Sequence, residues 1–313
     1  FSILNNLIQL YKFIIPYIRI AQMLNINFSK PSMVYLIGCI AYFIFSIADT
    51  FIKIGASDYA FTVIFAISSS AGCLPVMGFL IYKRSFSEIS SKNYSLHLIR
   101  GILMAAVGYS VLKGIILLPL SIAYPILLSA PVFLSIMGVL FLNEKINTYK
   151  VLSLITAMVG VILISGFSFQ EGFNKEGIIL LIVGSFLVAV LDLTVRLFGE
   201  KETTISLSFY NLLISAIIFF LLSINLWQPM NYVHLAQIIT GGFLIGIGML
   251  LLVFALKNIE ASYASITHYS QIIYGLIIGF IIFRHTPSYV EIIGSLFIIL
   301  SGYLIYFKLN KSD

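Results

Sequence analysis

Long apolar runs, separated by short polar segments, fill most of the chain. Each run holds about 20 residues, the length that a helix needs to cross a hydrocarbon core of about 30 Å at 1.5 Å per residue. The pattern predicts ten transmembrane helices. Their expected ranges are 33–53, 58–82, 96–117, 120–142, 148–168, 177–198, 204–226, 234–256, 261–283 and 289–308.

The first 30 residues differ from the rest of the chain. Residues 3–28 are apolar but are interrupted by polar side chains such as Lys12 and Arg19 and by Pro16. No small-residue cleavage site follows that would indicate a signal peptide. We expect residues 1–30 to form an amphipathic or interfacial segment rather than an eleventh span.

The composition agrees with a chain whose solvent is the lipid bilayer. Hydrophobic residues make up 60% and charged residues 10% of the 313 residues, whereas soluble domains carry roughly 25% charged residues. The net charge is +6, but the 18 basic residues are scattered between apolar runs and form no stripe with interleaved aromatics, so no nucleic-acid partner is expected. Cys39 and Cys73 lie inside apolar runs without ligand spacing, so we expect packing cysteines, no metal and no cofactor.

The distribution of basic residues predicts the orientation. With a cytoplasmic N-terminus, twelve Lys and Arg residues fall on the cytoplasmic side: Lys12, Arg19, Lys30, Lys83, Arg84, Lys92, Lys145, Lys150, Lys201, Lys257, Lys308 and Lys311. At most four fall on the opposite side: Lys53, Lys113, Lys175 and Arg284. The positive-inside rule therefore predicts a multi-pass protein of the cell inner membrane with both termini in the cytoplasm.

An internal repeat organises the ten spans. Asp49 and Lys53 close the first span, and Asp192 and Arg196 close the sixth, 143 residues later. Further matches at an offset of 141 are Gly138–Glu144 with Gly279–His285 and Ala123 with Ala264. Five spans per repeat is an odd number, so the two halves must cross the membrane in opposite directions, as in secondary transporters. The expected fold is an all-α integral membrane protein with ten transmembrane helices in a 5+5 inverted repeat, divided into 31–170 and 171–313.

Several short segments carry a family resemblance over residues 33–308. They are Leu118–Ala123, Pro131, Phe141–Glu144 and Gly160 in the first repeat, and Ala261–Ala264, Pro287 and Gly294 in the second. Together they resemble the repeat signature of EamA-type carriers in the drug/metabolite transporter superfamily. The second copy departs from that signature, because His285 replaces the usual glutamate and Ile272 stands in the place of Pro131. The resemblance implies a central cavity between the repeats and transport without ATP hydrolysis.

Three further segments bear on the substrate. His97–Gly101, Asp192 and Ser206–Tyr210 resemble the S-adenosylmethionine uptake type within this superfamily, and the matches are partly shared with amino-acid and riboflavin carriers. The resemblance implies a secondary transporter that moves a small polar metabolite across the inner membrane by alternating access. S-Adenosylmethionine uptake is the first expectation, and import or export of amino acids or riboflavin is the alternative.

Other classes of protein fit the sequence less well. No HExxH, GxSxG, Walker-type or CxxC motif occurs, so we expect no enzyme. A lipid flippase or a structural membrane subunit stays open as a reading of a different class. The expected partners are a small-molecule substrate and the lipid bilayer, and the sequence is compatible with a monomer or a homodimer.

Three charged residues within or at the ends of spans are candidates for substrate binding. An ionisable group near the bilayer centre costs at least ~2.5–3.5 kcal/mol, so each needs a partner or a water-filled cavity. Asp49 and Asp192 could neutralise a substrate cation or bind a coupling proton, or they could form local ion pairs with the base four residues on. Arg100 could bind a substrate carboxylate through its planar fork, or its side chain could extend to the membrane surface.

The ninth span has the densest set of polar residues. On a helix, Ser265, His268, Gln271 and Tyr274 would share one face. We expect this face to line the cavity, with hydrogen bonds from Ser265 and Gln271, stacking or a cation–π contact at Tyr274, and proton coupling at His268. The alternative is hydrogen bonding between helices. Tyrosines of the third and fourth spans, Tyr109 and Tyr124, could extend the same wall.

The fourth span carries the features of a broken helix. Pro125 and Pro131, six residues apart, predict a kink or break whose freed carbonyl groups could line the path. Glu144 follows this span on the expected cytoplasmic side, and we expect it to act in gating or packing.

Overall fold

The computed structural model describes residues 31–310 apart from 57–58, 92, 119, 146, 167–173, 285 and 287. Every regular element in these residues is a helix. The α-helices are α2 (Pro31–Gly55), α3 (Phe61–Lys83), α4 (Tyr94–Leu117), α5 (Leu120–Leu127), α6 (Ala130–Leu142), α7 (Thr148–Gly166), α8 (Lys175–Phe198), α9 (Thr204–Leu222), α10 (Tyr232–Asn258), α11 (Ala261–Ile266), α12 (Ser270–Phe283) and α13 (Tyr289–Asn310). The 3-10 helices are η1 (Phe86–Ile89), η3 (Gly199–Lys201) and η4 (Thr267–Tyr269).

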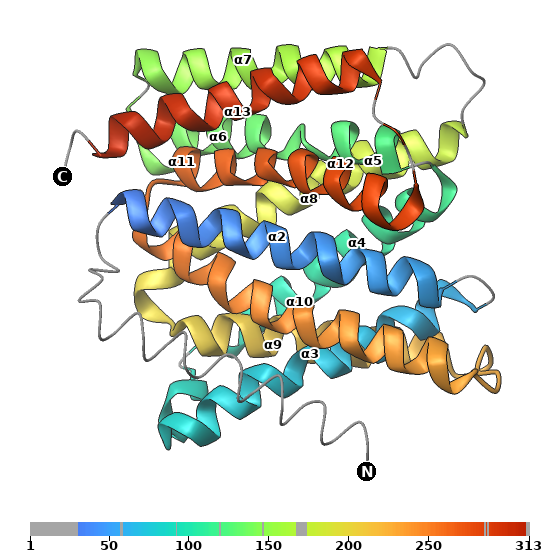
Figure 1. Ribbon diagram of the computed structural model, residues 1–313. Helices are drawn as coiled ribbons and strands as arrows, with labels where there is room; N and C mark the ends of the chain where they lie inside the picture. The colour runs from blue at the N-terminus through green and yellow to red at the C-terminus, as the bar shows by residue number, and fades with distance from the viewer. Residues whose placement is uncertain are drawn as a thin grey trace.

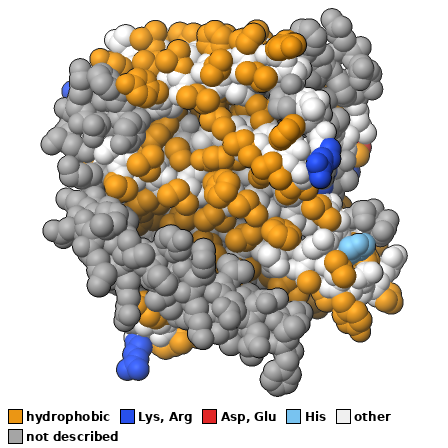
Figure 2. Space-filling view, viewed as in Figure 1, with side chains coloured by type: hydrophobic (Ala, Val, Ile, Leu, Met, Phe, Trp, Pro, Cys, Tyr) orange, Lys and Arg blue, Asp and Glu red, His pale blue; other side chains and the backbone are white. Residues whose placement is uncertain are grey.

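The helices confirm the expected fold class. Six of those described are long and apolar enough to cross a membrane, and four shorter apolar helices lie at the fourth, fifth, ninth and tenth expected spans. Hydrophobic side chains cover most of the described surface in Figure 2, as a lipid-facing surface requires. The interfacial segment expected at residues 1–30 lies outside the described residues.

The spans run side by side and alternate in direction (Figure 1). The start of α2 and the end of α13 lie at one end of the bundle, on the left in Figure 1. We name this end the proximal face. The end of α2 and the start of α13 lie at the other end, the distal face.

The two repeats are interleaved. The first helix of each repeat packs against the third helix of the other, so α2 contacts α10 and α8 contacts α4. Glycines in α10 permit the closest approach: a Cβ atom on Gly246 would lie 2.1 Å from the carbonyl oxygen of Gly72 in α3. Any larger side chain would force these helices apart, which is the packing expected of small residues between membrane helices.

The C-terminal ends of α6 and α12 have the same backbone geometry. Asn143 and Arg284 lie 141 residues apart, adopt left-handed φ angles of 53° and 56°, and donate their backbone N–H to the carbonyl groups of Gly138 and Gly279. The two halves therefore share a helix-capping geometry at the offset read from the sequence.

The fourth span of each repeat is broken. In the first repeat, α5 ends at Leu127 and α6 begins at Ala130, between the two prolines that predicted a break. Pro131 is buried in the first turn of α6, where its missing N–H costs no helical hydrogen bond.

The ninth span lies where the sequence predicted it, but it is interrupted. The 3-10 helix η4 interrupts it between α11 and α12, at the place equivalent to the break in the fourth span. Hydroxyl groups compete with the helical pattern there: Thr267 Oγ1 donates to Ala264 O at 2.5 Å and Ser270 Oγ donates to Thr267 O at 2.7 Å. The break therefore needs no proline.

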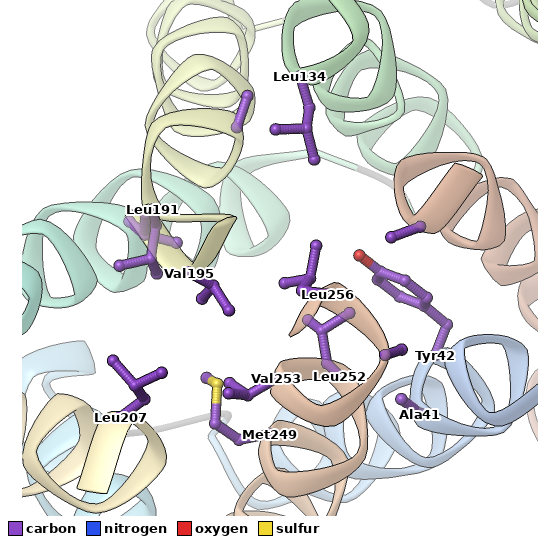
Figure 3. Close-up of a cluster of buried hydrophobic side chains, with 14 of the residues drawn as sticks. Ala41, Tyr42, Leu134, Leu191, Val195, Leu207, Met249, Leu252, Val253 and Leu256 are labelled. Carbon is purple, nitrogen blue, oxygen red and sulfur yellow. The ribbon is translucent and has the colours of Figure 1, made fainter. Parts of the chain in front are cut away.

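Apolar side chains fill the centre of the proximal half. Figure 3 shows Leu134, Val195, Leu252 and Leu256 converging from α6, α8 and α10, beside the ring of Tyr42. Val195 and Leu256 lie within one turn of helix ends at the proximal face. We name these four aliphatic residues the apolar plug.

Candidate substrate-binding site

Asp49 is the centre of a polar cluster that joins three helices. Its Oδ2 accepts a hydrogen bond from Tyr124 Oη at 3.2 Å and another from Gln271 Nε2 at 3.4 Å. Tyr124 comes from α5 and Gln271 from α12, so both broken spans contribute to it. Tyr124 and Gln271 are buried and Asp49 is partly exposed. The structure thus brings three of the expected site residues together near the distal end of α2.

The base four residues after Asp49 also lies within reach. Lys53 is partly buried and interacts electrostatically with Asp49. This electrostatic interaction accompanies the hydrogen bonds to Asp49 from two other helices, and the local ion pair considered from the sequence stays a prediction. Those two hydrogen bonds come from neutral donors, which orient the carboxylate without cancelling its charge.

An aromatic pair lies on the proximal side of this cluster. The rings of Tyr42 and His268 stack with centroids 4.2 Å apart and an interplanar angle of 14°. Tyr42 precedes Asp49 by seven residues, which places it on the same side of α2 about two turns, or roughly 10 Å, away. Both rings are buried. The pair joins α2 to η4 between the Asp49 cluster and the proximal end of α2.

Arg100 and Asp192 are two buried charged residues that interact electrostatically. The Arg100 side chain is 1% exposed and its Nη1 donates to Leu191 O at 3.0 Å and to Thr194 Oγ1. It interacts electrostatically with the buried Asp192. Arg100 is therefore anchored on α8, and the idea that its side chain extends to the membrane surface is wrong.

The base that follows Asp192 serves a different purpose. Arg196 Nη1 donates to Leu256 O and Lys257 O, both at 3.1 Å, and so caps the end of α10. Among the described contacts, the charge that faces Asp192 is Arg100. The two symmetry-related aspartates therefore have different partners.

Several expected site residues lie apart from the Asp49 cluster. Tyr109 is 39% exposed and contacts Phe61 and Lys113. Tyr274 is partly buried, and its ring lies 5.0 Å from that of Phe43, an exposed residue of α2. The side chains of Ser265 and Pro125 lie outside what the structure describes.

Glu144 lies in an ionic cluster at the proximal face. Its Oε2 is 3.6 Å from Lys150 Nζ, and Lys150 also binds Glu260 of the second repeat. The gating or packing role expected for Glu144 stays a prediction. No group of three or more His, Cys, Asp or Glu side chains that could hold a metal occurs among the described residues.

Two functional candidates were not identified from the sequence. Tyr42 had a recognisable signal, because it lies seven residues before Asp49 and thus on the same helix face. Glu202 had none, because it lies in a short loop and gains its partners only when distant segments meet.

A family model supports the resemblance seen in the sequence. The model described as EamA-like transporter family matches residues 32–166 and again residues 175–307. The two matches correspond to the two sets of five spans.

Proteins of known name are similar over most of the chain. The S-adenosylmethionine uptake transporter of Rickettsia bellii (strain RML369-C) is 27% identical over 76% of this chain and 80% of its own length. That of Rickettsia prowazekii (strain Madrid E) is 25% identical over 85% of this chain and 90% of its own. The pseudopaline exporter CntI of Pseudomonas aeruginosa (strain UCBPP-PA14) is 22% identical over 85% of this chain and 93% of its own.

A solved structure shows the same fold. A protein described only as "Crystal structure of protein" superposes with a TM-score of 0.73 at 14% identity, over 90% of this chain and 99% of that one. Because the family model matches both halves, the chain belongs to the EamA-like transporter family and is a multi-pass membrane transporter.

Proposed function

We propose that this transporter takes up S-adenosylmethionine across the inner membrane by alternating access, with both termini and the proximal face in the cytoplasm. The cytoplasmic assignment rests on the excess of Lys and Arg on the proximal side. The substrate assignment draws on the relatives named S-adenosylmethionine uptake transporter, which are similar over most of the chain.

The observation that carries the proposal is the environment of Asp49. S-Adenosylmethionine bears a sulfonium and an ammonium group, and a carboxylate oriented by Tyr124 and Gln271 can accept either. Neutral hydrogen-bond donors orient its oxygens without cancelling its charge, and the basic group described near it is Lys53, which is partly buried. A partly buried carboxylate attracts a cation more strongly than it would at an exposed surface.

The rest of the site suits the remaining parts of this substrate. The Tyr42 and His268 rings provide an aromatic surface on the proximal side, against which an adenine could pack. Arg100 and Asp192 lie beyond it, and Asp192 also interacts electrostatically with Tyr42. Their electrostatic interaction fits a role in holding α4 and α8 together.

Export is the second candidate, because a relative covering 85% of this chain is named an exporter. Amino acids and riboflavin are the alternative substrates within the superfamily. A flippase or structural subunit is a weaker reading, because the chain belongs to a transporter family.

Counterflow in proteoliposomes tests the substrate. Purified protein is reconstituted with unlabelled S-adenosylmethionine inside, and entry of labelled S-adenosylmethionine is followed against protein-free liposomes. We expect saturable entry that adenosine and methionine, which lack the sulfonium charge, inhibit at most twofold at equal concentration. Absence of counterflow, together with accumulation of riboflavin or another amino acid in the same vesicles, would reject the substrate. Uptake by intact cells compared with efflux from preloaded cells then distinguishes import from export.

A further inference from the structure

A buried carboxylate joins the two repeats at the proximal face. Glu202, between η3 and α9 of the second repeat, is 5% exposed. Its Oε1 accepts a hydrogen bond from Ser91 Oγ at 2.6 Å, and its Oε2 lies 3.2 Å from His97 Nε2. Ser91 and His97 belong to the first repeat, at the start of α4. The contact therefore crosses the boundary between the repeats.

The second repeat holds Glu202 in place from the other side. Ser206 Oγ donates to Glu202 Oε2 at 3.2 Å, and Lys257 Nζ donates to Glu202 O at 2.7 Å. We name Ser91, His97, Glu202, Ser206 and Lys257 the Glu202 cluster. Thr203 adds a further link between the repeats, because its Oγ1 donates to Glu88 O at 2.5 Å.

A second ionic cluster crosses between the repeats at the same face. Lys150 of α7 is buried and binds Glu144 in the first repeat and Glu260 in the second. Its Nζ lies 4.6 Å from the ring centroid of Tyr263, whose hydroxyl accepts a hydrogen bond from Asn147 Nδ2 at 2.7 Å. The proximal ends of the two repeats are thus joined at two charged sites, of which the Glu202 site is buried and the other pairs the buried Lys150 with Glu260, whose side chain is 48% exposed.

The equivalent contact at the distal face carries no formal carboxylate charge. Tyr59 lies 143 residues before Glu202, the offset that also relates Asp49 to Asp192. Its hydroxyl lies 3.2 Å from Nδ1 of His234, at the start of α10, and accepts a hydrogen bond from the Asn231 backbone. Tyr59 and His234 are only partly buried.

The ion pair described at the distal face is also more exposed. Lys113 and Glu176 are separated by 2.5 Å, but their side chains are 29% and 58% exposed. Exposed pairs contribute little to stability. Charge-assisted hydrogen bonds are about twice as strong as neutral ones, and salt screens them much less when they are buried.

We propose that the Glu202 cluster is a latch that holds the proximal face closed at rest, so that the empty transporter presents its binding site to the distal face. At rest the more exposed Tyr59–His234 contact can break and re-form while the Glu202 cluster stays intact. In the opening step, Ser91 and His97 move away from Glu202 and the Tyr59–His234 contact stays formed. The proposal rests on the alternating-access function proposed above but on no particular substrate. It assigns a positioning role to Glu202, a residue away from the Asp49 cluster.

Cysteine labelling in the absence of substrate tests the latch. Val195→Cys, in the apolar plug, reports on the proximal side, and Lys53→Cys, one turn beyond Asp49, reports on the distal side. Each probe is placed in a Cys39→Ala/Cys73→Ala background, and its rate of reaction with a polar maleimide is measured on the purified full-length protein. Glu202→Gln is compared with Glu200→Gln, which removes an exposed charge two residues away.

We expect Glu202→Gln to raise labelling at the Val195 position about tenfold and to lower labelling at the Lys53 position by at least about threefold, as population shift between two states requires. Ser91→Ala should move both rates in the same directions by a smaller factor, and Glu200→Gln should move neither. A higher labelling rate at both probes would show a loss of packing and would contradict the latch. Unchanged rates, or a change at only one probe, would also contradict it. Because no substrate is present, a failure of S-adenosylmethionine counterflow leaves this result unaffected.

Discussion

Asp49 and Asp192 occupy matching positions in the two repeats but have different surroundings. Asp49 accepts hydrogen bonds from the neutral groups of Tyr124 and Gln271 and is partly exposed. Asp192 is buried and interacts with the Arg100 guanidinium, which is itself held on α8. Each repeat therefore carries an aspartate at the same position. The helices packed around it determine which groups the aspartate faces.

The difference suggests a division of roles. Asp49 has neutral hydrogen-bond donors and the partly buried Lys53 near it, so it can exchange these interactions for a substrate cation at small cost. If Asp192 turned to a substrate instead, the buried Arg100 would lose its counter-charge. We therefore expect Asp49 to contribute mainly to substrate binding and Asp192 mainly to stability.

The largest expected effect is on stability at Asp192. Asp192→Asn leaves Arg100 buried without its counter-charge, which should destabilise the protein by about 3–5 kcal/mol. Thermal unfolding of the purified protein in detergent measures the change. The double variant Asp192→Asn/Arg100→Gln should recover part of the loss, since it removes both charges. If the stability lost in the double variant equals the sum of the losses in the two single variants, the two residues do not interact.

Transport should be most sensitive to Asp49. Asp49→Asn keeps the size of the side chain but removes its charge, and we expect uptake efficiency to fall about 100-fold, which corresponds to about 2.7 kcal/mol. Labelled S-adenosylmethionine uptake at equal membrane levels of protein measures this, with Glu200→Gln as the control. Retention of more than half of wild-type uptake would show that Asp49 does not bind the cation.

A smaller effect is expected from the tyrosines. Tyr124→Phe removes one hydrogen bond to Asp49, so the substrate concentration at half-maximal rate should rise about fivefold, in line with ~1 kcal/mol for such a bond. Tyr109→Phe is the matched control, because Tyr109 lies on the exposed side of α4. Equal effects of the two substitutions would show that Tyr124 is not part of the binding site.

The smallest effect concerns pH at the Glu202 cluster. Burial by itself raises the pKa of Glu202, but hydrogen bonds from Ser91, His97 and Ser206 outweigh it and hold the pKa below the ordinary glutamate value. The charged and titratable groups around the carboxyl are His97, Lys257 and Tyr210.

Because the pKa of Glu202 is depressed in the closed state, its ionisation stabilises that state at every pH above the ordinary glutamate pKa. This stabilisation is lost as the pH falls through the depressed pKa. The labelling rate of the Val195→Cys probe is divided at each pH by the rate of the same probe in the Glu202→Gln variant, which removes the pH dependence of the thiolate fraction. This ratio should change less than about twofold from pH 7 to pH 5 and rise only below about pH 4.3. A rise already at pH 6 would show that another group controls the latch.

The sequence predicted much of the site but not its arrangement. Asp49, Tyr124 and Gln271 were identified separately, as an acid near a span end, a tyrosine in the fourth span and an amide in the ninth, and only packing showed that they meet. Tyr109 fitted the same reasoning equally well, because residue type and span number do not specify which side of a helix faces the cavity.

The features that the sequence determined by itself depend on neighbouring residues and on the overall distribution of apolar residues. The length of the apolar runs required membrane helices, their odd number per repeat required inversion, and the two prolines marked the break in the fourth span. The second break, the pairing of Arg100 with Asp192 and the burial of Glu202 were decided by the tertiary structure. Each depends on contacts between segments far apart in the chain, and no local pattern encodes which partner a buried polar group will find.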